Sequence, residues 1–315
     1  MPLTEPAKNI LHRRVVRLMG NRFELSVVND DESSAQLFID QAIAEIQRIE
    51  DLLTTFKETS QTNQINLNAG ITPVRVEPEV FDLIQRSLRI SQLTQGAFDI
   101  SYGSIDKRFW NFDTKMTSLP DPQLALQSVR LINYRNIILD EKDCTVFLKE
   151  KGMSIGFGGI GKGYAADRAR SFLQGKGINS GVVNAAGDLV TWGSQPNGKP
   201  WIVGIADPNQ KQHPFSQLEV SNMAVATSGD YEKFAIINGK RYSHTIDPKT
   251  GFPVSGISSV TIICPTAELA DALATPVMVM GVTAGLHLIN QMKQVACIII
   301  DDHNRVHTSK NIRIT

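Results

Sequence analysis

The chain has 315 residues with 32 basic and 32 acidic side chains, and its formal net charge at pH 7 is zero. This balance excludes a strong attraction of the whole molecule to nucleic acid or to an anionic membrane surface, so we expect neither as a partner. The hydrophobic share of 42% and the charged share of 20% are typical of a globular protein with a substantial core. Cys144, Cys264 and Cys297 fit no zinc or disulfide pattern and are predicted to be buried small hydrophobic residues.

The N-terminal region carries no export signal that we can identify. Residues 1–20 contain neither an apolar signal region nor a small-residue cleavage site. No apolar run in the chain reaches the ~18 residues that a membrane span needs. We therefore expect no membrane span and a cytoplasmic location for the chain as written; a removed leader would place it in the periplasm or at a membrane.

In the first half of the chain, apolar periodicity and turn residues separate helices from strands. The predicted elements are a strand over 15–28, an amphipathic helix over 33–56, a polar loop over 59–70, a helix over 78–96, a mixed segment over 100–135 and a hairpin over 136–149. The helix over 33–56 is the clearest, because its apolar residues from Ile39 to Phe56 keep three- and four-residue spacing. Pro78 is a favoured first-turn residue for the next helix.

The second half of the chain is richer in strands. Its predicted elements are a helix over 164–175, a strand-rich block over 181–264, a helix after Thr266 to about Met280, a further helix, and a hairpin over 296–309. The turn Pro196-Asn197-Gly198 is typical of a hairpin, and Pro276 is expected to bend its helix. Because the strands cluster and the helices flank them, the pattern predicts an α+β fold of mixed antiparallel sheets flanked by helices.

The segment GFGGIGKGYAAD, from Gly156 to Asp167, has five glycines in its first eight residues and then becomes helical. It fits the dinucleotide pattern G-x-G-x-x-G, but the expected parallel strands around it are lacking. It nearly fits a phosphate-binding P-loop, except that Gly163 stands where a Ser or Thr should bind Mg²⁺. Unhindered N–H groups at a helix N-terminus, together with Lys162, indicate anion binding. A purely packing role for the glycines remains an alternative.

Two further groups of residues carry chemistry. His244, in YSHTIDPKTG, lies at a predicted strand end beside a tight turn and is a candidate general base. Asp271 and Thr275 are four residues apart on a predicted helix and share one face, where their oxygens suit Mg²⁺. The structural alternatives are a histidine that caps its turn and a threonine that bonds to its own helix backbone.

Nine segments, in this order along the chain, resemble motifs of the ApbE family of FAD:protein FMN transferases. They are Leu18–Gly20, Ser60–Asn66, Thr94–Ser101, Gly158–Asp167, Val182–Leu189, Pro200–Pro208, 225–231, 244–253 and Ala270–Thr275. The resemblance implies one ApbE-like, T-fold-related domain over residues 1–315, with two α+β lobes that divide near residue 150 and an FAD cleft between them.

The resemblance also implies an activity. Members of the family bind FAD and Mg²⁺, cleave the pyrophosphate, release AMP, and attach FMN through a phosphoester to a Ser or Thr of an acceptor redox protein. Some members instead hydrolyse FAD to FMN and AMP. From a different class, an oxidoreductase that uses FAD or NAD, or a non-catalytic flavin-binding protein, remains open.

Matched position by position, the resemblance assigns roles to single residues. Asp271, Thr275 and the backbone carbonyl of Gly159 are expected to ligate Mg²⁺, and His244 to activate the acceptor hydroxyl, with Asp271 and His244 the catalytic pair. The residues expected to line FAD are Met19, Ala97, Phe98, Asp99, Gly158, Lys162 and Thr245. One departure stands out: the family commonly has Asp where this chain has Gly156.

Overall fold

The computed structural model of the chain describes residues 9–106, 108, 118–206, 214–229 and 234–312. An eight-stranded sheet lies at its centre, with strand order β1-β2-β6-β7-β10-β13-β14-β15. All its neighbouring strands are antiparallel. The strands are β1 (Ile10–Leu18), β2 (Asn21–Asn29), β6 (Gly181–Ala185), β7 (Asp188–Trp192), β10 (Ala224–Gly229), β13 (Ile257–Cys264), β14 (Ala296–Asp301) and β15 (Val306–Thr308). The predicted strand-rich block supplies the middle of this sheet.

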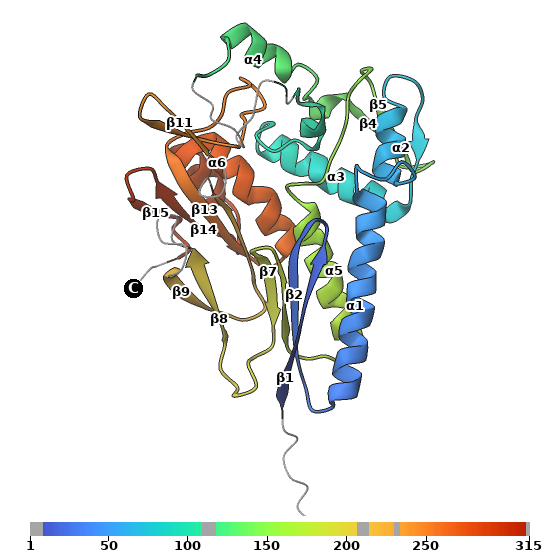
Figure 1. The fold of residues 1–315 in the computed structure, drawn as a ribbon, viewed down its shortest axis with the longest axis vertical. Coiled ribbons are helices and arrows are strands. Elements are labelled where there is room, and N and C mark those ends of the chain that lie inside the picture. The colour runs from blue at the N-terminus through green and yellow to red at the C-terminus, as the bar shows by residue number, and fades with distance from the viewer. Residues whose placement is uncertain (1–8, 107, 109–117, 207–213, 230–233, 313–315) are drawn as a thin grey trace, which may run out of the picture.

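Three helices cover one face of the sheet (Figure 1). They are α1 (Glu32–Leu53), α5 (Gly161–Gly175) and α6 (Ala267–Ile289). Helix α1 buries its apolar stripe, from Ala35 to Leu53, against α5, β1 and β2, as the three- and four-residue spacing predicts. Helix α5 lies between α1 and α6 and contacts both. This position makes α5 the element that links the two other helices.

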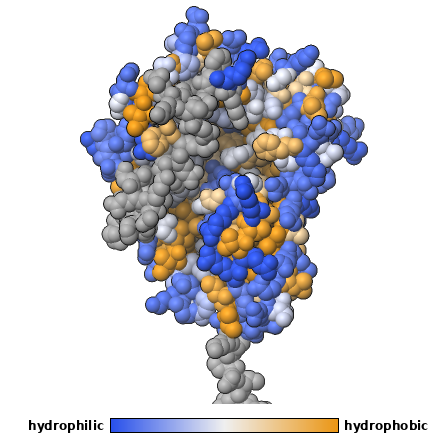
Figure 2. All heavy atoms as spheres, in the orientation of Figure 1, coloured by the Kyte–Doolittle hydropathy of each residue, from blue (hydrophilic) through white to orange (hydrophobic). Residues whose placement is uncertain are grey.

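The hairpin of β8 (Trp201–Ala206) and β9 (Pro214–Val220) packs on the opposite face of the sheet. Trp201, Val203 and Val220 contact Leu189 and Val225 there, in a second apolar cluster. Figure 2 shows hydrophobic residues over the β1–β2 hairpin, ringed by hydrophilic ones.

Smaller elements gather at one end of the sheet (Figure 1). They are α2 (Gln61–Leu67), α3 (Pro78–Leu93), the 3₁₀ turns η1 (Ile100–Ser104) and η3 (Tyr134–Asn136), α4 (Pro122–Ser128), a three-stranded sheet of β3 (Val74–Arg75), β5 (Thr145–Leu148) and β4 (Ile137–Asp140), and the ribbon of β11 (Phe234–Ile237) and β12 (Lys240–Ser243). The mixed helices and antiparallel sheets confirm the predicted α+β class. The division into two lobes near residue 150 stays a prediction.

Helix α6 is interrupted at Gly281, whose φ of 81° and ψ of 169° are not helical. The interruption separates the two helices that were predicted here, and it lies five residues beyond Pro276, where the bend was expected. Among the described residues, α6 is the one helix that is long and apolar enough to cross a membrane by length and composition. Half of that apolar window is buried inside the protein, against β10, β13 and α5.

Several local predictions are wrong. Residues 15–28 are not one strand but parts of β1 and β2, because a tight turn at Met19 and Gly20 divides them. The predicted polar loop over 59–70 contains α2, whose first turn is capped by Ser60 Oγ, which accepts a hydrogen bond from Asn63 N at 3.1 Å. Phe56 is not part of the buried stripe of α1, because the helix ends at Leu53 and leaves Phe56 97% exposed.

Two further corrections concern turns. Cys144 is only partly buried, in the β4–β5 turn, whereas Cys264 and Cys297 are buried as predicted. The Pro196-Asn197-Gly198 turn is closed by a hydrogen bond from Gly198 N to Gln195 O at 2.9 Å. It does not make a hairpin, since β7 and β8 on either side of it belong to different sheets.

Candidate functional site

A cavity of about 1010 Å³ lies where the β1–β2 turn, the end of α1, η1, the glycine-rich segment and α6 meet. Its volume is at the upper end of the ~300–1,000 Å³ typical of ligand pockets. Ten of the eleven predicted site residues line it: Met19, Ala97, Phe98, Asp99, Gly158, Gly159, Lys162, His244, Thr245 and Thr275. The eleventh, Asp271, is 5% exposed and is not part of the lining. Sequence positions on both sides of residue 150 thus contribute to one cavity.

The β1–β2 turn brings Met19 to the cavity. Met19 and Gly20 have φ values of 49° and 72°, in the left-handed region where glycine is at no disadvantage. The Asn21 side chain donates a hydrogen bond from Nδ2 to the Met19 carbonyl at 2.8 Å. This short turn therefore holds the Met19 side chain against the cavity and the adjacent core.

The stretch before η1 lines the cavity with its aromatic ring and backbone. Phe98 N donates to Thr94 Oγ1 at 3.0 Å, which anchors the residue where α3 has ended. The carboxylate of Asp99 accepts hydrogen bonds from Ser101 N at 2.8 Å, Ser101 Oγ at 2.6 Å and Tyr134 N at 2.7 Å. Burial raises the pKa of Asp99, and these hydrogen bonds oppose the rise. Asp99 thus uses its carboxylate to hold η1 in place.

The glycine-rich segment runs along the cavity wall before α5 begins. Asn66 clamps it, because its side chain donates to Ile155 O at 3.0 Å and accepts from Ile155 N at 2.7 Å. Gly156 N donates to Ile100 O at 2.9 Å. A Cβ atom added at Gly158 would meet nothing within 4 Å. The backbone is therefore fixed by hydrogen bonds and still open toward the cavity.

Helix α5 then packs directly against α6 through Gly163. A Cβ atom at this position would lie 2.1 Å from the carbonyl oxygen of Ala267 and 2.9 Å from the Asp271 Cβ atom. With glycine there, Gly163 N donates to Asp271 Oδ2 at 3.0 Å. Close helix contact explains why glycine stands at the P-loop Ser/Thr position. The dinucleotide-fold interpretation is wrong, because β6, the first strand after the segment, pairs antiparallel on both sides.

Lys162 faces two buried carboxylates. Its Nζ atom lies 2.8 Å from Asp188 Oδ2 and 3.5 Å from both carboxylate oxygens of Asp271. Burial, and then the charge of Asp271, raise the pKa of Asp188 to about 7, while Lys162 opposes the rise. Burial also raises the pKa of Asp271. For Lys162, burial alone would lower the pKa, but the two carboxylates raise it. The ammonium stays charged, and two acids share it.

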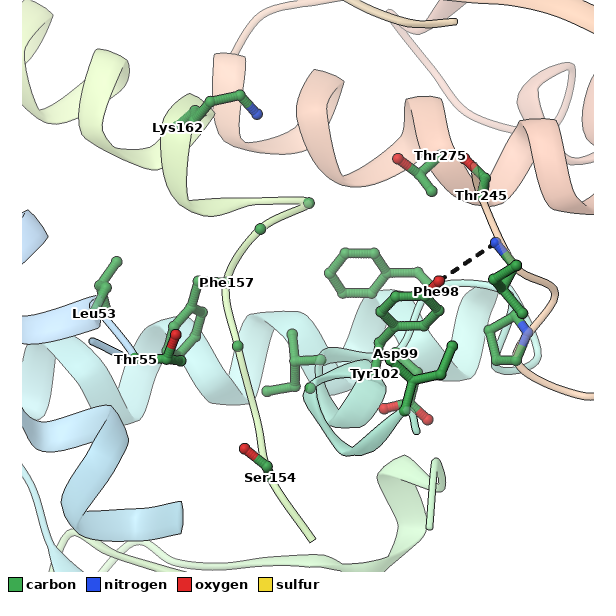
Figure 3. Close-up of a pocket in the computed structure, with 18 of the residues that line it drawn as sticks. Leu53, Thr55, Phe98, Asp99, Tyr102, Ser154, Phe157, Lys162, Thr245 and Thr275 are labelled. Carbon is green, nitrogen blue, oxygen red and sulfur yellow. Dashed lines mark hydrogen bonds between the residues drawn. The ribbon is translucent and has the colours of Figure 1, made fainter. Parts of the chain in front are cut away.

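Thr275 and Lys162 project from α6 and α5 on one side of the cavity, and Phe157, Phe98 and Tyr102 lie across from them (Figure 3). Thr275 Oγ1 lies 3.1 Å from Ser228 Oγ on β10, and either hydroxyl can be the donor. The polar end of the cavity is therefore next to the cluster of Lys162, Asp188 and Asp271, while the opposite wall is aromatic.

His244 is exposed and lines the cavity directly after β12. Its neighbour Thr245 is held by hydrogen bonds from its own N–H to Ser243 Oγ at 3.1 Å and from Val254 N to its carbonyl at 2.9 Å. The following turn is closed by a hydrogen bond from Gly251 N to Asp247 O at 2.9 Å. The His244 imidazole thus sits where both the cavity and an outside partner can reach it.

Some residues of the site were not predicted from the sequence. Asp188 was not predicted, although it lies in the motif Val182–Leu189 directly after the turn at Ala186-Gly187, where an acid after a turn is a usable signal. Phe157 and Tyr102 line the cavity but are ordinary core residues by sequence. The ends of two quoted motifs, Asp207–Pro208 and 230–231, lie outside the described residues.

Comparison with known proteins follows this geometry. The sequence profile of the ApbE family matches residues 19–299. A protein of Klebsiella pneumoniae (strain 342) named FAD:protein FMN transferase is 31% identical over 299 residues, which cover 94% of this chain and 91% of that protein. A protein of the same name from Treponema pallidum (strain Nichols) is 30% identical over 289 residues, which cover 87% and 80% of the two chains.

Solved structures agree with the sequence relatives. The crystal structure of an ApbE protein from Thermotoga maritima superposes with a TM-score of 0.85 at 28% identity, covering 96% of this chain and 98% of that one. The flavinyl transferase ApbE of Pseudomonas stutzeri superposes with a TM-score of 0.83 at 24% identity, covering 96% and 95%. The second likeness supports the fold, which extends over nearly the whole of each chain.

Proposed function

Because this chain belongs to the ApbE family, we propose that it transfers FMN from FAD to a Ser or Thr hydroxyl of an acceptor redox protein, forming a phosphoester and releasing AMP. The chain is an enzyme of the transferase class, as its relatives are. The observation that carries the proposal is the cavity, in which ten residues matched to the family's motifs converge from distant parts of the sequence. The aromatic wall of the cavity suits the flavin ring, and its charged end suits the pyrophosphate of the same ligand.

We further propose that Asp271, Thr275 and the Gly159 carbonyl hold Mg²⁺. The donor set fits the ion: it consists of oxygens, which Mg²⁺ prefers, and two buried carboxylates here share the single ammonium of Lys162. When both carboxylates are ionised, one negative charge is left over, which a second cation would neutralise. When bound, Mg²⁺ would neutralise charge on the pyrophosphate oxygens.

The protein's own groups supply the rest of the electrostatics. Phosphoryl transfer needs mainly charge stabilisation and positioning from the protein. At the start of α5, Gly161 N and Gly163 N already donate to Phe157 O and Asp271 Oδ2, so the backbone proposed to face an anion is the open stretch at Gly158. Lys162, on the cavity wall, adds a positive charge beside it. These groups are in place before the ligand arrives, so little reorganisation opposes the reaction.

His244 is proposed to accept the proton of the acceptor hydroxyl. General bases of this kind contribute ~10²–10⁴-fold to rate. The exposure of His244 at the cavity suits this role, since a protein substrate has to approach from outside. Its imidazole would hold the proton while the hydroxyl oxygen bonds to the phosphorus of the FMN half.

The test is to incubate the full chain with FAD, Mg²⁺ and a flavin-acceptor domain, and to view a denaturing gel under ultraviolet light. We expect a fluorescent acceptor band, its loss with a chelator, and its recovery with added Mg²⁺. Asp271→Asn should abolish the band, and His244→Asn should reduce it by ~10²-fold or more. Free FMN and AMP without a labelled acceptor would show hydrolysis instead, and unchanged bound FAD would show a flavin carrier.

A further inference from the structure

The position of the Lys162 ammonium is uneven between its two acids. It lies 2.8 Å from Asp188 Oδ2 but 3.5 Å from each oxygen of Asp271. The side chains of Asp188 and Asp271 are 9% and 7% exposed, against 22% for Lys162. Water is thus largely excluded from the acids, and Lys162 is the cation that the structure places next to them.

We propose that Lys162 is the built-in counter-ion of Asp271 in the metal-free enzyme, and that Asp188 is a positioning residue that draws this ammonium away and so sets the affinity for the divalent ion. The inference rests on the proposed metal site at Asp271. It adds a role for Asp188, which the site described above does not use as a ligand, and a second role for Lys162 besides facing the ligand.

The physical argument is competition for one carboxylate. An uncompensated carboxylate in a buried site is costly, so ionised Asp271 needs a cation whether or not a metal is bound. Lys162 and a divalent ion can each neutralise the charge of Asp271, so each weakens the interaction of the other with this carboxylate. The position of the Lys162 ammonium between Asp188 and Asp271 therefore decides how strongly Asp271 binds the divalent ion.

Asp188 is well placed to fix the ammonium. It begins β7, and the backbone N–H of Thr227 on the neighbouring strand β10 helps to lower its pKa. Asp271 Oδ2 accepts a hydrogen bond from Gly163 N at 3.0 Å, while among the described residues Oδ1 has only the 3.5 Å contact with Lys162. Without the charge of Asp188, Lys162 has one anionic partner left in this cluster, Asp271, and moves onto it.

The first experiment measures thermal stability in the presence of a chelator, without FAD. Lys162→Met should lower the melting temperature by several degrees, because both acids lose their counter-ion. Adding Asp188→Asn to Lys162→Met should recover part of this loss, because it removes one of the two uncompensated charges. If Lys162→Met left the melting temperature unchanged, Lys162 would not be the counter-ion.

The second experiment titrates Mg²⁺ alone, at constant ionic strength, and records the concentration that gives half of the thermal stabilisation. Asp188→Asn should raise this concentration about tenfold, and Lys162→Met should lower it. In the double variant the effect of Asp188→Asn should disappear, because Asp188 acts through Lys162. An equal effect in both backgrounds would show that Asp188 attracts the ion directly and would overturn the inference.

Asp301→Asn is the matched control. Asp301, at the end of β14, is 8% exposed against 6% for Asp188, and it is likewise paired with a basic side chain, His307, at 2.9 Å. Its variant should change the melting temperature without changing the Mg²⁺ concentration dependence. The outcomes also separate the two proposals: a wild-type chain that Mg²⁺ does not stabilise overturns the metal site and this inference together, whereas equal weakening in both backgrounds overturns the inference alone.

Discussion

The two halves of the glycine-rich segment use glycine for different reasons. In the first half, a Cβ atom at Gly156 would have the Thr55 methyl group as its nearest neighbour at 3.9 Å, and at Gly158 it would meet nothing within 4 Å. In the second half, a Cβ atom at Gly161 would lie 3.2 Å from the Phe157 Cβ atom, and at Gly163 it would lie 2.1 Å from a backbone oxygen of α6. One half is open to the cavity and the other is closed by packing.

One run of glycines therefore serves two purposes. The closed half lets α5 approach α6, and this approach gives Asp271 its hydrogen bond from Gly163 N and places Lys162 beside it. The open half leaves backbone along the cavity wall for a ligand to contact. Substitutions in the closed half should therefore change the free energy of unfolding, and those in the open half should change the affinity for FAD.

Gly163→Ala should have the largest effect. The methyl group would strike the Ala267 carbonyl at 2.1 Å, and backbone cannot yield as a flexible side chain does. Overpacking of this kind costs ~1–3 kcal/mol and occasionally more, so we expect a loss of about 3 kcal/mol in the free energy of unfolding and loss of flavin transfer. Urea denaturation followed by circular dichroism measures the first. A stability within ~0.5 kcal/mol of wild type would contradict the close contact.

Gly161→Ala should have an intermediate effect. The new methyl group would press on the Phe157 Cβ atom at 3.2 Å, and Phe157 lines the cavity, where its ring has room to shift. Alanine at the start of α5 also gains helix propensity over glycine, which offsets part of the strain. We expect a loss of about 1 kcal/mol in the free energy of unfolding, together with weaker FAD binding measured by flavin fluorescence. Unchanged FAD binding would show that Phe157 does not contact the flavin.

Gly156→Asp should change function more than stability. The position has only ordinary contact with Thr55, so a side chain fits toward the cavity, and the resemblance to the family places a carboxylate there. We expect the free energy of unfolding to stay within ~0.5 kcal/mol and kcat/KM for FAD to rise several-fold. Gly156→Asn, of equal size and without charge, is the control that separates the carboxylate from its bulk. A fall in kcat/KM for the Asp variant alone would mean that the site is adapted to lack this charge.

Much of the fold could be predicted from the sequence because its strongest signals are periodic. The stripe of α1 and the alternation of β6 report directly which face is buried, whereas β13 is an apolar run that is buried along its whole length. Turns were harder, since the two-residue turn at Met19 keeps the alternation of its flanking strands almost intact. Helix α2 was missed because it is short and polar, with little more than Thr62 and Ile65 buried. The local sequence pattern also does not show which strands pair with each other: β7 and β8 follow one another in the chain but belong to different sheets.

The candidate site, like the fold, could be predicted from the sequence only in part. Ten of the eleven residues predicted from the motifs line the cavity, and their roles there stay predictions. The sequence could not show that the Asp99 carboxylate is committed to Ser101 and Tyr134. Nor could it show that Asp188 and Asp271 share Lys162, since these three residues meet only when α5, α6 and β7 pack together. Contacts between different helices and strands are set by tertiary packing, and no spacing of residues along the sequence indicates them.

Gly158→Ala should have the smallest effect on stability and the opposite sign to Gly163→Ala. Its methyl group would enter open space, and its backbone φ is not among those in the left-handed region, so alanine adopts the native conformation without strain. A compatible Gly→Ala change stabilises by ~0.4–1 kcal/mol, because the unfolded chain loses freedom. We expect a gain near the lower value and a rise of about tenfold in KM for FAD, the lower end of what one extra carbon in a binding pocket costs. A loss of stability from this variant would erase the distinction between the open and the closed half, whereas a gain paired with a weaker substrate interaction would locate the ligand-facing backbone at Gly158.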